Sequence, residues 1–111
     1  MVFSEYHAHI YFDQETYVQA ENLCLEAEKL FPIKRGRFHK KNVGPHPCWS
    51  CQLAFEASEF PTLIPWLNFH RKGLNVLIHP VTDDDLKDHQ DYTMWLGQSF
   101  TLDLSIFTRK R

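Results

Sequence analysis

Residues 6–12 read Tyr-His-Ala-His-Ile-Tyr-Phe, and in this stretch apolar and polar side chains alternate. Successive side chains of a β-strand point to opposite faces of its sheet, so alternation is typical of a half-buried strand. One face has Tyr6, Ala8, Ile10 and Phe12, and the other has His7, His9 and Tyr11. The stretch therefore predicts a strand with one side in the core and two histidines on the opposite side.

The segment after this strand has the period of an amphipathic helix. Asp13 can cap the helix, and Pro32 ends it. Its apolar residues fall on one stripe, namely Ala20, Leu23, Cys24, Ala27, Leu30 and Phe31. This stripe predicts a helix that packs against the apolar face of the first strand.

Four more regular segments follow along the chain. The patterns predict an edge strand over the basic residues 33–39, a strand over 49–55, a helix over 62–72 and a strand over 75–79. Thr62 is the expected N-cap of the second helix, and Gly73 is its expected left-handed stop. The resulting order is that of an α+β protein, a ferredoxin-like βαββαβ sandwich with an antiparallel sheet.

Residues 82–107 follow the six elements of the ferredoxin-like plan and are not part of it. Thr82 can cap a short C-terminal helix, residues 95–97 predict a turn, and the alternation of residues 100–107 predicts an extra strand. That strand would extend the sheet or pair with a second subunit. With 111 residues and no linker, residues 1–111 are expected to form a single domain.

The composition argues against several classes of function. A formal charge of −2 at pH 7 is unlike that of a nucleic-acid-binding protein, which needs a basic face. The first residues lack the regions of a signal peptide, and no stretch has the length of a membrane span. We therefore expect a cytoplasmic protein whose three cysteines are thiols. Cys48 and Cys51 have CxxC spacing, but on a strand they would face opposite ways.

Four histidines far apart in the sequence are expected to converge. We expect the first and third strands to run parallel in the centre of the sheet, so that both their starts and the end of the fourth strand share one edge. His7 and His9 lie near the start of the first strand, His46 precedes the third, and His79 ends the fourth. Imidazole is the commonest metal-binding side chain. The pattern predicts a metal site at this edge, whereas His39 and His70 are expected at the surface.

Six short motifs occur in order along the chain: YHAHIYF at 6–12, GPHP at 44–47, VLIHP at 76–80, DH at 88–89, WLG at 95–97 and LDLS at 102–105. Together, from Tyr6 to about Ile106, they resemble the DOPA 4,5-dioxygenase family. The resemblance implies a homodimeric, ferredoxin-like enzyme. Such an enzyme opens the ring of a small aromatic diol such as L-DOPA, using non-haem Fe(II) and O₂.

The resemblance also implies roles for individual residues. The family's histidine positions fall on His7, His9, His46 and His79, with His89 as a further candidate. We expect His7, His9 and His79 as metal ligands and His46 as a fourth ligand or the acid–base group. For His89 three alternatives stay open, namely a second catalytic residue, a ligand or a residue that faces solvent. Arg35 or Arg37 is expected to hold a substrate carboxylate through a bidentate contact.

Several alternatives stay open at this point. Non-haem iron sites commonly include a carboxylate, for which the candidates are Glu5, Asp88 or an acid of a second subunit. An all-histidine site suits zinc equally, and zinc or nickel can replace iron in a purified sample. The chain is also compatible with a zinc-dependent hydrolase or a metal-binding protein that uses the same histidines. A non-catalytic dimeric ligand-binding module is the third hypothesis, because this fold serves many functions.

Overall fold

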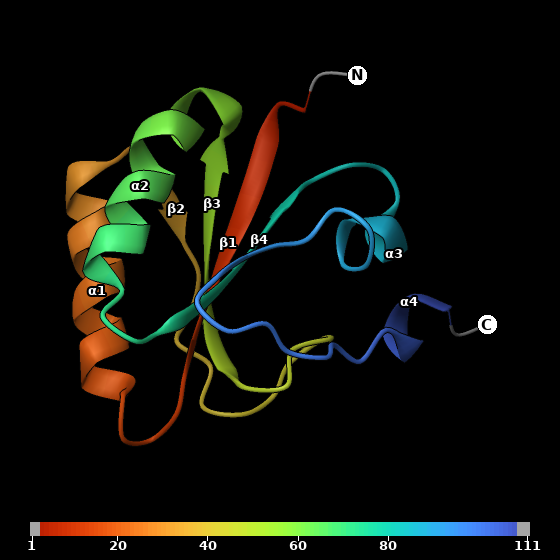
Figure 1. Cartoon of the computed structure of the whole chain (residues 1–111), viewed down its shortest axis with the longest axis horizontal. Helices are drawn as coiled ribbons and strands as arrows, with labels where there is room; N and C mark the ends of the chain where they lie inside the picture. The colour runs from red at the N-terminus through yellow and green to blue at the C-terminus, as the bar shows by residue number, and fades with distance from the viewer. Residues whose placement is uncertain (1–2, 109–111) are drawn as a thin grey trace.

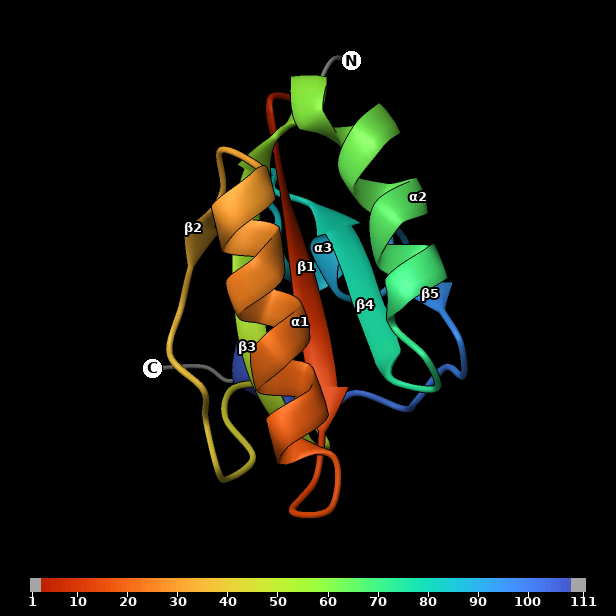
Figure 2. The same ribbon diagram turned by 90° about the vertical axis from the view of Figure 1, so that its left-hand side faces the viewer.

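The computed structural model describes residues 3–108, which form one five-stranded antiparallel sheet with helices on both sides. Figure 1 and Figure 2 show α1 and α2 side by side on one face of the sheet, with α3 and α4 beyond the other face. The strands are β1 (Glu5–Phe12), β2 (Lys34–Arg35), β3 (Trp49–Glu56), β4 (Asn75–Pro80) and β5 (Met94–Leu96). The helices are α1 (Tyr17–Leu30), the 3₁₀ turn η1 (Ala57–Glu59), α2 (Phe60–His70), α3 (Asp85–Asp88) and α4 (Ser105–Thr108).

The strand order is β2-β3-β1-β4-β5, which confirms the ferredoxin-like plan with one added strand. The expectation that β1 and β3 run parallel is wrong, because Glu5 pairs with Glu56 and Phe12 with Trp49. After β1, helix α1 returns the chain, so β2 runs in the direction of β1. Strand β3 then turns back and lies between them, antiparallel to both. The start of β1 therefore shares an edge with the ends of β3 and β4.

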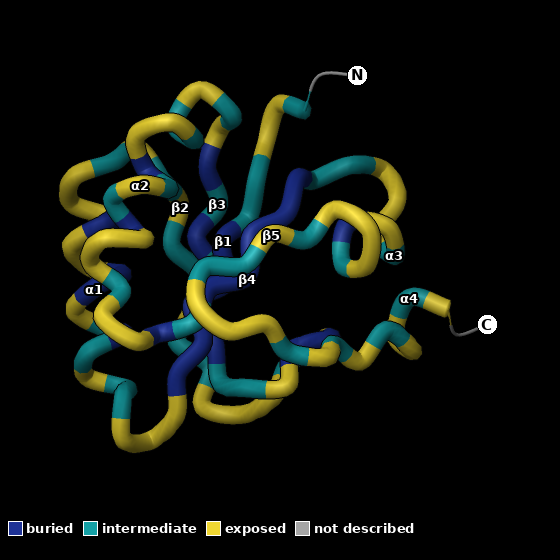
Figure 3. Tube along the Cα trace, in the orientation of Figure 1, coloured by how far each residue is buried: buried dark blue, intermediate teal, exposed yellow. Residues whose placement is uncertain are grey.

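The core lies between the sheet and the two long helices. Helix α1 buries four of the residues in its predicted stripe, and α2 buries Leu63 and Leu67. They pack on Ala8 and Ile10 of β1 and their neighbours in β3 and β4, so the predicted alternation of β1 is confirmed. In Figure 3 the buried part of the chain follows the central strands and the inner sides of both helices. Leu30, the last residue of α1, is instead 54% exposed.

The bounds of two elements, β2 and α2, differ from the predictions. Strand β2 has only two residues, followed by an isolated bridge between His39 and Ser50. Helix α2 begins at Phe60, directly after η1, with Glu59 rather than Thr62 as N-cap. Here Pro61 occupies the first turn, where a missing N–H leaves no hydrogen bond unmade.

The fifth strand exists, but in a different segment. Residues 94–96 pair with β4, whereas a turn was predicted at 95–97. Residues 100–104 form no strand, and α4 follows them. The aromatic side chains of this segment and of α4 make other contacts. Phe100 contacts Tyr11 and Trp95, and Phe107 of α4 stacks on His89. The alternation therefore reflects a segment that covers the open face of the sheet.

Within residues 3–108, every helix is too short or too polar to span a bilayer.

Candidate metal centre

Two neighbouring strands bring three histidines together on the face of the sheet opposite α1 and α2. His7 and His9 are two residues apart in β1 and so project from the same face, and His79 of β4 pairs directly with His7. One ring nitrogen of each lies within 4.8 Å of the others. His9 Nε2 and His79 Nε2 are 3.0 Å apart. We call these three residues the histidine triad.

Hydrogen bonding leaves Nε2 of His79 as an acceptor nitrogen that faces Nε2 of His9. Its Nδ1 lies 2.8 Å from the carbonyl oxygen of Pro80, which can only accept, so Nδ1 donates. In the neutral ring, Nε2 then has a lone pair. A bond of this kind is typical of metal-bound histidines, because it fixes the tautomer. Two nitrogens bound at right angles to one ion at about 2.1 Å lie about 3 Å apart, so the His9–His79 separation fits a shared metal.

Burial holds the triad in the neutral form that binds metals. Burial lowers the pKa of His79 to about 4, and it lowers the pKa of His9 well below its usual value, with a further contribution from the neighbouring imidazoles. The pKa of His7 is also lowered by burial, although the charge of Glu5 opposes this. The imidazole lone pairs are therefore not protonated at pH 7 and are available to a cation.

His46 reaches the triad from the loop between β2 and β3. Its backbone N–H donates to Val43 O at 3.1 Å. Its buried ring lies 4.2 Å from the ring of His9, centre to centre. Burial lowers the pKa of His46 to about 4. The structure thus brings His46 to the triad by a route other than the expected one. The loop places it near Tyr11, close to the end of β1, rather than at the edge where β1 starts.

His89 lies beside His79, at the end of α3. Its ring centre is 4.3 Å from that of His79 and 6.4 Å from that of His46. His89 Nδ1 donates to Asp85 O at 2.8 Å, so the Nε2 of the neutral ring has a free lone pair. The ring of Phe107 stacks on it at 4.6 Å. His46 and His89 therefore lie beside the triad and near each other, His46 against His9 and His89 against His79.

Iron sites commonly contain a carboxylate ligand, and Asp88 is a buried carboxylate that affects His7 and His79 by its charge. It is 1% exposed, and its two oxygens accept from the N–H and the hydroxyl of Thr82. Its charge raises the pKa of His7 and His79 slightly against the effect of burial. Among residues 3–108, however, the group of mutually close ligand atoms comprises the three imidazoles and no carboxylate. Asp88 holds the segment before α3 and modulates the triad by charge.

Comparison with known proteins identifies the family. A model described as the Dopa 4,5-dioxygenase family matches residues 6–106. The chain belongs to this family. It is 27% identical over 110 residues to DOPA 4,5-dioxygenase of Amanita muscaria, a match that covers 91% of this chain and 48% of the relative. It is 33% identical over 113 residues to an uncharacterized 21.2 kDa protein of Botryotinia fuckeliana, covering 91% of this chain and 62% of the relative.

A solved structure shares the whole fold. The crystal structure of a Nostoc punctiforme protein described as a “putative dioxygenase” matches with a TM-score of 0.93 and 35% identity. The match covers 96% of this chain and 92% of the other. By contrast, this chain spans only about half to three fifths of the length of the curated fungal relatives it matches. The family and the fold are thereby established for this dioxygenase-family domain.

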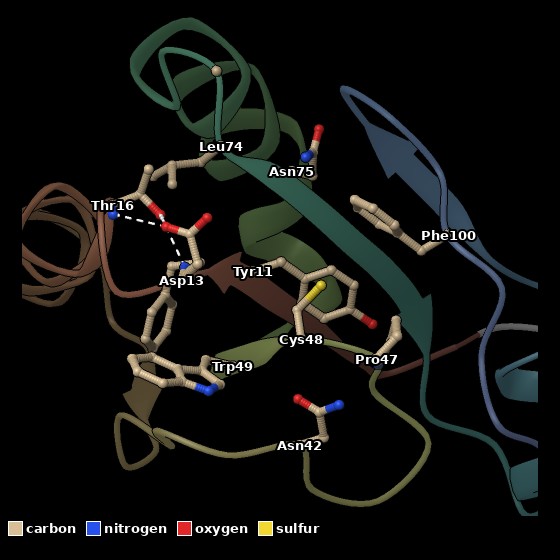
Figure 4. Close-up of a pocket in the computed structure, with 12 residues that line it drawn as sticks. Tyr11, Asp13, Thr16, Asn42, Pro47, Cys48, Trp49, Leu74, Asn75 and Phe100 are labelled. Carbon is tan, nitrogen blue, oxygen red and sulfur yellow. Dashed lines mark hydrogen bonds between the residues drawn. The ribbon is translucent and has the colours of Figure 1, made fainter.

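A cavity of about 460 Å³ lies at the end of β1, and Tyr11 is one of the residues that line it. Figure 4 shows the Tyr11 ring beside Cys48 in the middle of its lining, with Pro47 and Phe100 close by. The hydroxyl of Tyr11 lies 2.8 Å from His46 Nδ1, so one residue contacts both the cavity and the histidines. Sequence reasoning assigned Tyr11 no role. The alternation of the first strand places Tyr11 on the same face as His7 and His9, and this could have indicated a role for it.

The structure does not bring the two arginine candidates to the histidine cluster. The guanidinium of Arg35 forms an ion pair with Glu28 of α1 at 2.9 Å, on the helix-covered side of the sheet. Arg37 is exposed in the segment after β2. His39 and His70 also lie apart from the triad, since His39 bridges to Ser50 and the exposed His70 packs against Trp66 of α2.

Proposed function

We propose that this domain is an extradiol dioxygenase that cleaves the ring of a small catechol, such as L-DOPA, with non-haem Fe(II) and O₂. The histidine triad is the observation on which the proposal rests, since three neutral imidazoles converge on one face of the sheet. The family name and the description of the Nostoc punctiforme structure support an oxygenase. In the reaction, both atoms of O₂ enter the product, and the carbon–carbon bond beside the diol breaks.

The donor set suits a catalytic rather than a purely structural metal. His7, His9 and His79 would hold the ion, and three protein ligands leave positions for other molecules. When bound, Fe(II) would supply the neighbouring coordination sites at which a catechol and O₂ can react, with the catechol providing the electrons that reduce O₂. The protein's own contribution is to hold these rings neutral and correctly oriented, which burial and the Pro80 carbonyl achieve.

His89 is the proposed acid–base group. Because its Nδ1 donates to Asp85 O, its Nε2 can accept a proton from a catechol hydroxyl and return it later. Its ring packs between His79 and Phe107, which limits its orientations. His46 is the second proposed catalytic residue, and its ring lies beside that of His9.

The cavity beside Tyr11 is the proposed site for the substrate's side chain. Its volume of about 460 Å³ falls within the range of roughly 300–1,000 Å³ that is typical of small-molecule sites. Its walls include the aromatic rings of Tyr11, Trp49 and Phe100, which suit an aromatic substrate, and amide groups such as that of Asn42 that can orient polar substituents.

Oxygen uptake tests this proposal directly. The protein is loaded with Fe(II) without oxygen, and O₂ consumption and absorbance are followed after L-DOPA or catechol is added in air. We expect one O₂ per substrate and a new yellow product, and both should be lost in His9→Ala. His70→Ala is the matched control, because His70 lies on the exposed side of α2, and it should retain activity. Tight Fe(II) binding without O₂ uptake for any catechol would refute the proposal.

A zinc-dependent function is the second candidate. The observation that favours it is the absence of a carboxylate from the group of close ligand atoms among the described residues, because an all-nitrogen set suits zinc as well as iron. This alternative predicts an activity that is supported by zinc, unaffected by removal of O₂ and retained after oxidation of the sample. An activity supported only by Fe(II) and dependent on O₂ would exclude it.

A further inference from the structure

Tyr11 is the side chain that connects the cavity to the histidines. It is 3% exposed, and its ring contacts Trp95 and Phe100 at centre-to-centre distances of 6.0 and 5.8 Å. Its hydroxyl lies 2.8 Å from Nδ1 of His46. Because both rings are buried and packed, this contact is a fixed feature of the site rather than one of several alternative rotamers.

The direction of this hydrogen bond follows from the available acceptors. Over residues 3–108, His46 Nδ1 is the hydrogen-bond partner of the Tyr11 hydroxyl, and no other acceptor contacts it. If His46 Nδ1 donated instead, the hydroxyl proton would have no acceptor among the side chains and backbone of residues 3–108, and leaving a buried donor unpaired costs about 1–3 kcal/mol. Tyr11 therefore donates, and Nδ1 of His46 accepts.

An imidazole whose Nδ1 accepts a hydrogen bond has its proton on Nε2. We propose that Tyr11 is a positioning residue that fixes this tautomer. His46 then acts as a neutral hydrogen-bond donor to an oxygen of the bound catechol, and not as a metal ligand or a base. The reaction assigned to His46 rests on the proposed function, whereas the tautomer is a property of the folded protein itself.

The other rings of the cluster have the opposite arrangement. His79 and His89 both donate from Nδ1 to backbone carbonyls, so their Nε2 atoms are lone-pair nitrogens. His46 alone among these three presents an N–H at Nε2, and it lies outside the group of mutually close ligand atoms. A preorganised donor beside a site where an oxygen gains negative charge stabilises that charge without any proton transfer. The proposed N–H of His46 and the lone-pair nitrogen of His89 thus belong to two neighbouring rings, whose centres are 6.4 Å apart.

Nitrogen-15 NMR of the zinc-loaded protein tests the tautomer independently of activity. We expect a protonated, pyrrole-type Nε2 and an unprotonated, pyridine-type Nδ1 for His46, assigned by the loss of these signals in His46→Gln. Tyr11→Phe should shift both nitrogens toward intermediate values as the tautomers mix. Tyr17→Phe is the control, since it removes a hydroxyl bonded to Glu21 on the helix side. A protonated Nδ1 in the unmodified protein would overturn the proposal.

Kinetics of the Fe(II) enzyme test the donor role. A glutamine amide can donate but cannot act as a base, so His46→Gln should keep kcat within about tenfold, whereas His46→Ala should lose about 10²–10³-fold. Tyr11→Phe should lower kcat by about 10–100-fold with KM unchanged, and it should have no further effect in the His46→Gln background. Equal losses in His46→Gln and His46→Ala would refute the donor role. If the unmodified enzyme turns over no catechol, the proposed function fails, and the NMR result still decides the tautomer.

Discussion

Lowering the pH from 7 to 5 is expected to destabilise the metal-free protein strongly. His46 and His79 are buried, and each has a pKa of about 4 in the folded protein, against 6.5 for an unperturbed histidine. The unfolded chain therefore binds more protons than the folded one below about pH 6.5. The stabilising effect of the neutral rings is complete above that pH and is lost progressively as the pH falls toward 4.

The size of the effect follows from linkage. At pH 5, a shift from 6.5 to about 4 corresponds to a loss of about 2 kcal/mol for each ring, and so about 4 kcal/mol for both. A domain of this size has a total stability of roughly 5–15 kcal/mol, so the loss is a large fraction of it. His9, whose pKa is lowered further, adds to the loss in the same direction.

Urea denaturation at pH 7, 6 and 5 in the presence of a chelator measures this loss. Carboxylates with lowered pKa values, such as Asp13, also destabilise the fold in acid, so the histidine share is isolated by comparison. His79→Gln should reduce the difference between pH 7 and pH 5 by about 2 kcal/mol. His70→Gln, at an exposed position of α2, should leave it unchanged. The same pH dependence in His79→Gln and in the unmodified protein would refute the reasoning.

Three further predictions concern stability and metal binding. Leu63→Ala, at a fully buried position between α2 and the sheet, should lower the free energy of unfolding by about 2–5 kcal/mol in urea, and a loss below 1 kcal/mol would contradict the described packing. Thr82→Val removes the hydroxyl donor to the buried Asp88 and should cost about 1–3 kcal/mol; an unchanged melting temperature would contradict that role. Zinc at about 100 times its Kd should stabilise the protein by about 2.7 kcal/mol in thermal denaturation, and an equal effect in His9→Ala would exclude the triad as its site.

The parts of the fold that follow from local periodicity could be predicted from the sequence. The alternation in β1 specified which residues face the helices and that His7 and His9 share the other face. The apolar stripe of α1 specified its buried side. These features depend on side-chain period alone, which is a property of each segment by itself.

The parts that depend on long-range pairing could not be derived in the same way. The direction of β3 relative to β1 follows from the crossover through α1, and the sequence-based expectation had it reversed. Residues 94–96 form β5 because they pair with the free edge of β4. The pattern of these three residues alone does not predict that pairing. The basic side chain of Arg35 is directed to Glu28, which is seven positions earlier in the sequence, so its charge alone did not predict its partner.

The candidate site shows the same division. The pairing of His7 with His79 depends on strand register, and both histidines were predicted to meet. The position of His46 depends on a loop whose conformation is set by a turn at Val43 and by the contact with Tyr11. The tautomer of a histidine depends on hydrogen-bond partners that a sequence does not reveal, which is why the role of His46 stayed open between ligand and acid–base group.

The segment over the histidine face has a consequence for access to the site. The contacts of residues 100–108 with the rest of the molecule include a backbone hydrogen bond from Asp103 to Pro45 and the rings of Phe100 and Phe107. Because these contacts are separate from the ladders of the sheet, this segment can open by local unfolding at a small fraction of the global free energy. We expect amide hydrogen exchange in this segment to be much faster than in β1, and the entry of substrate to follow that opening rate.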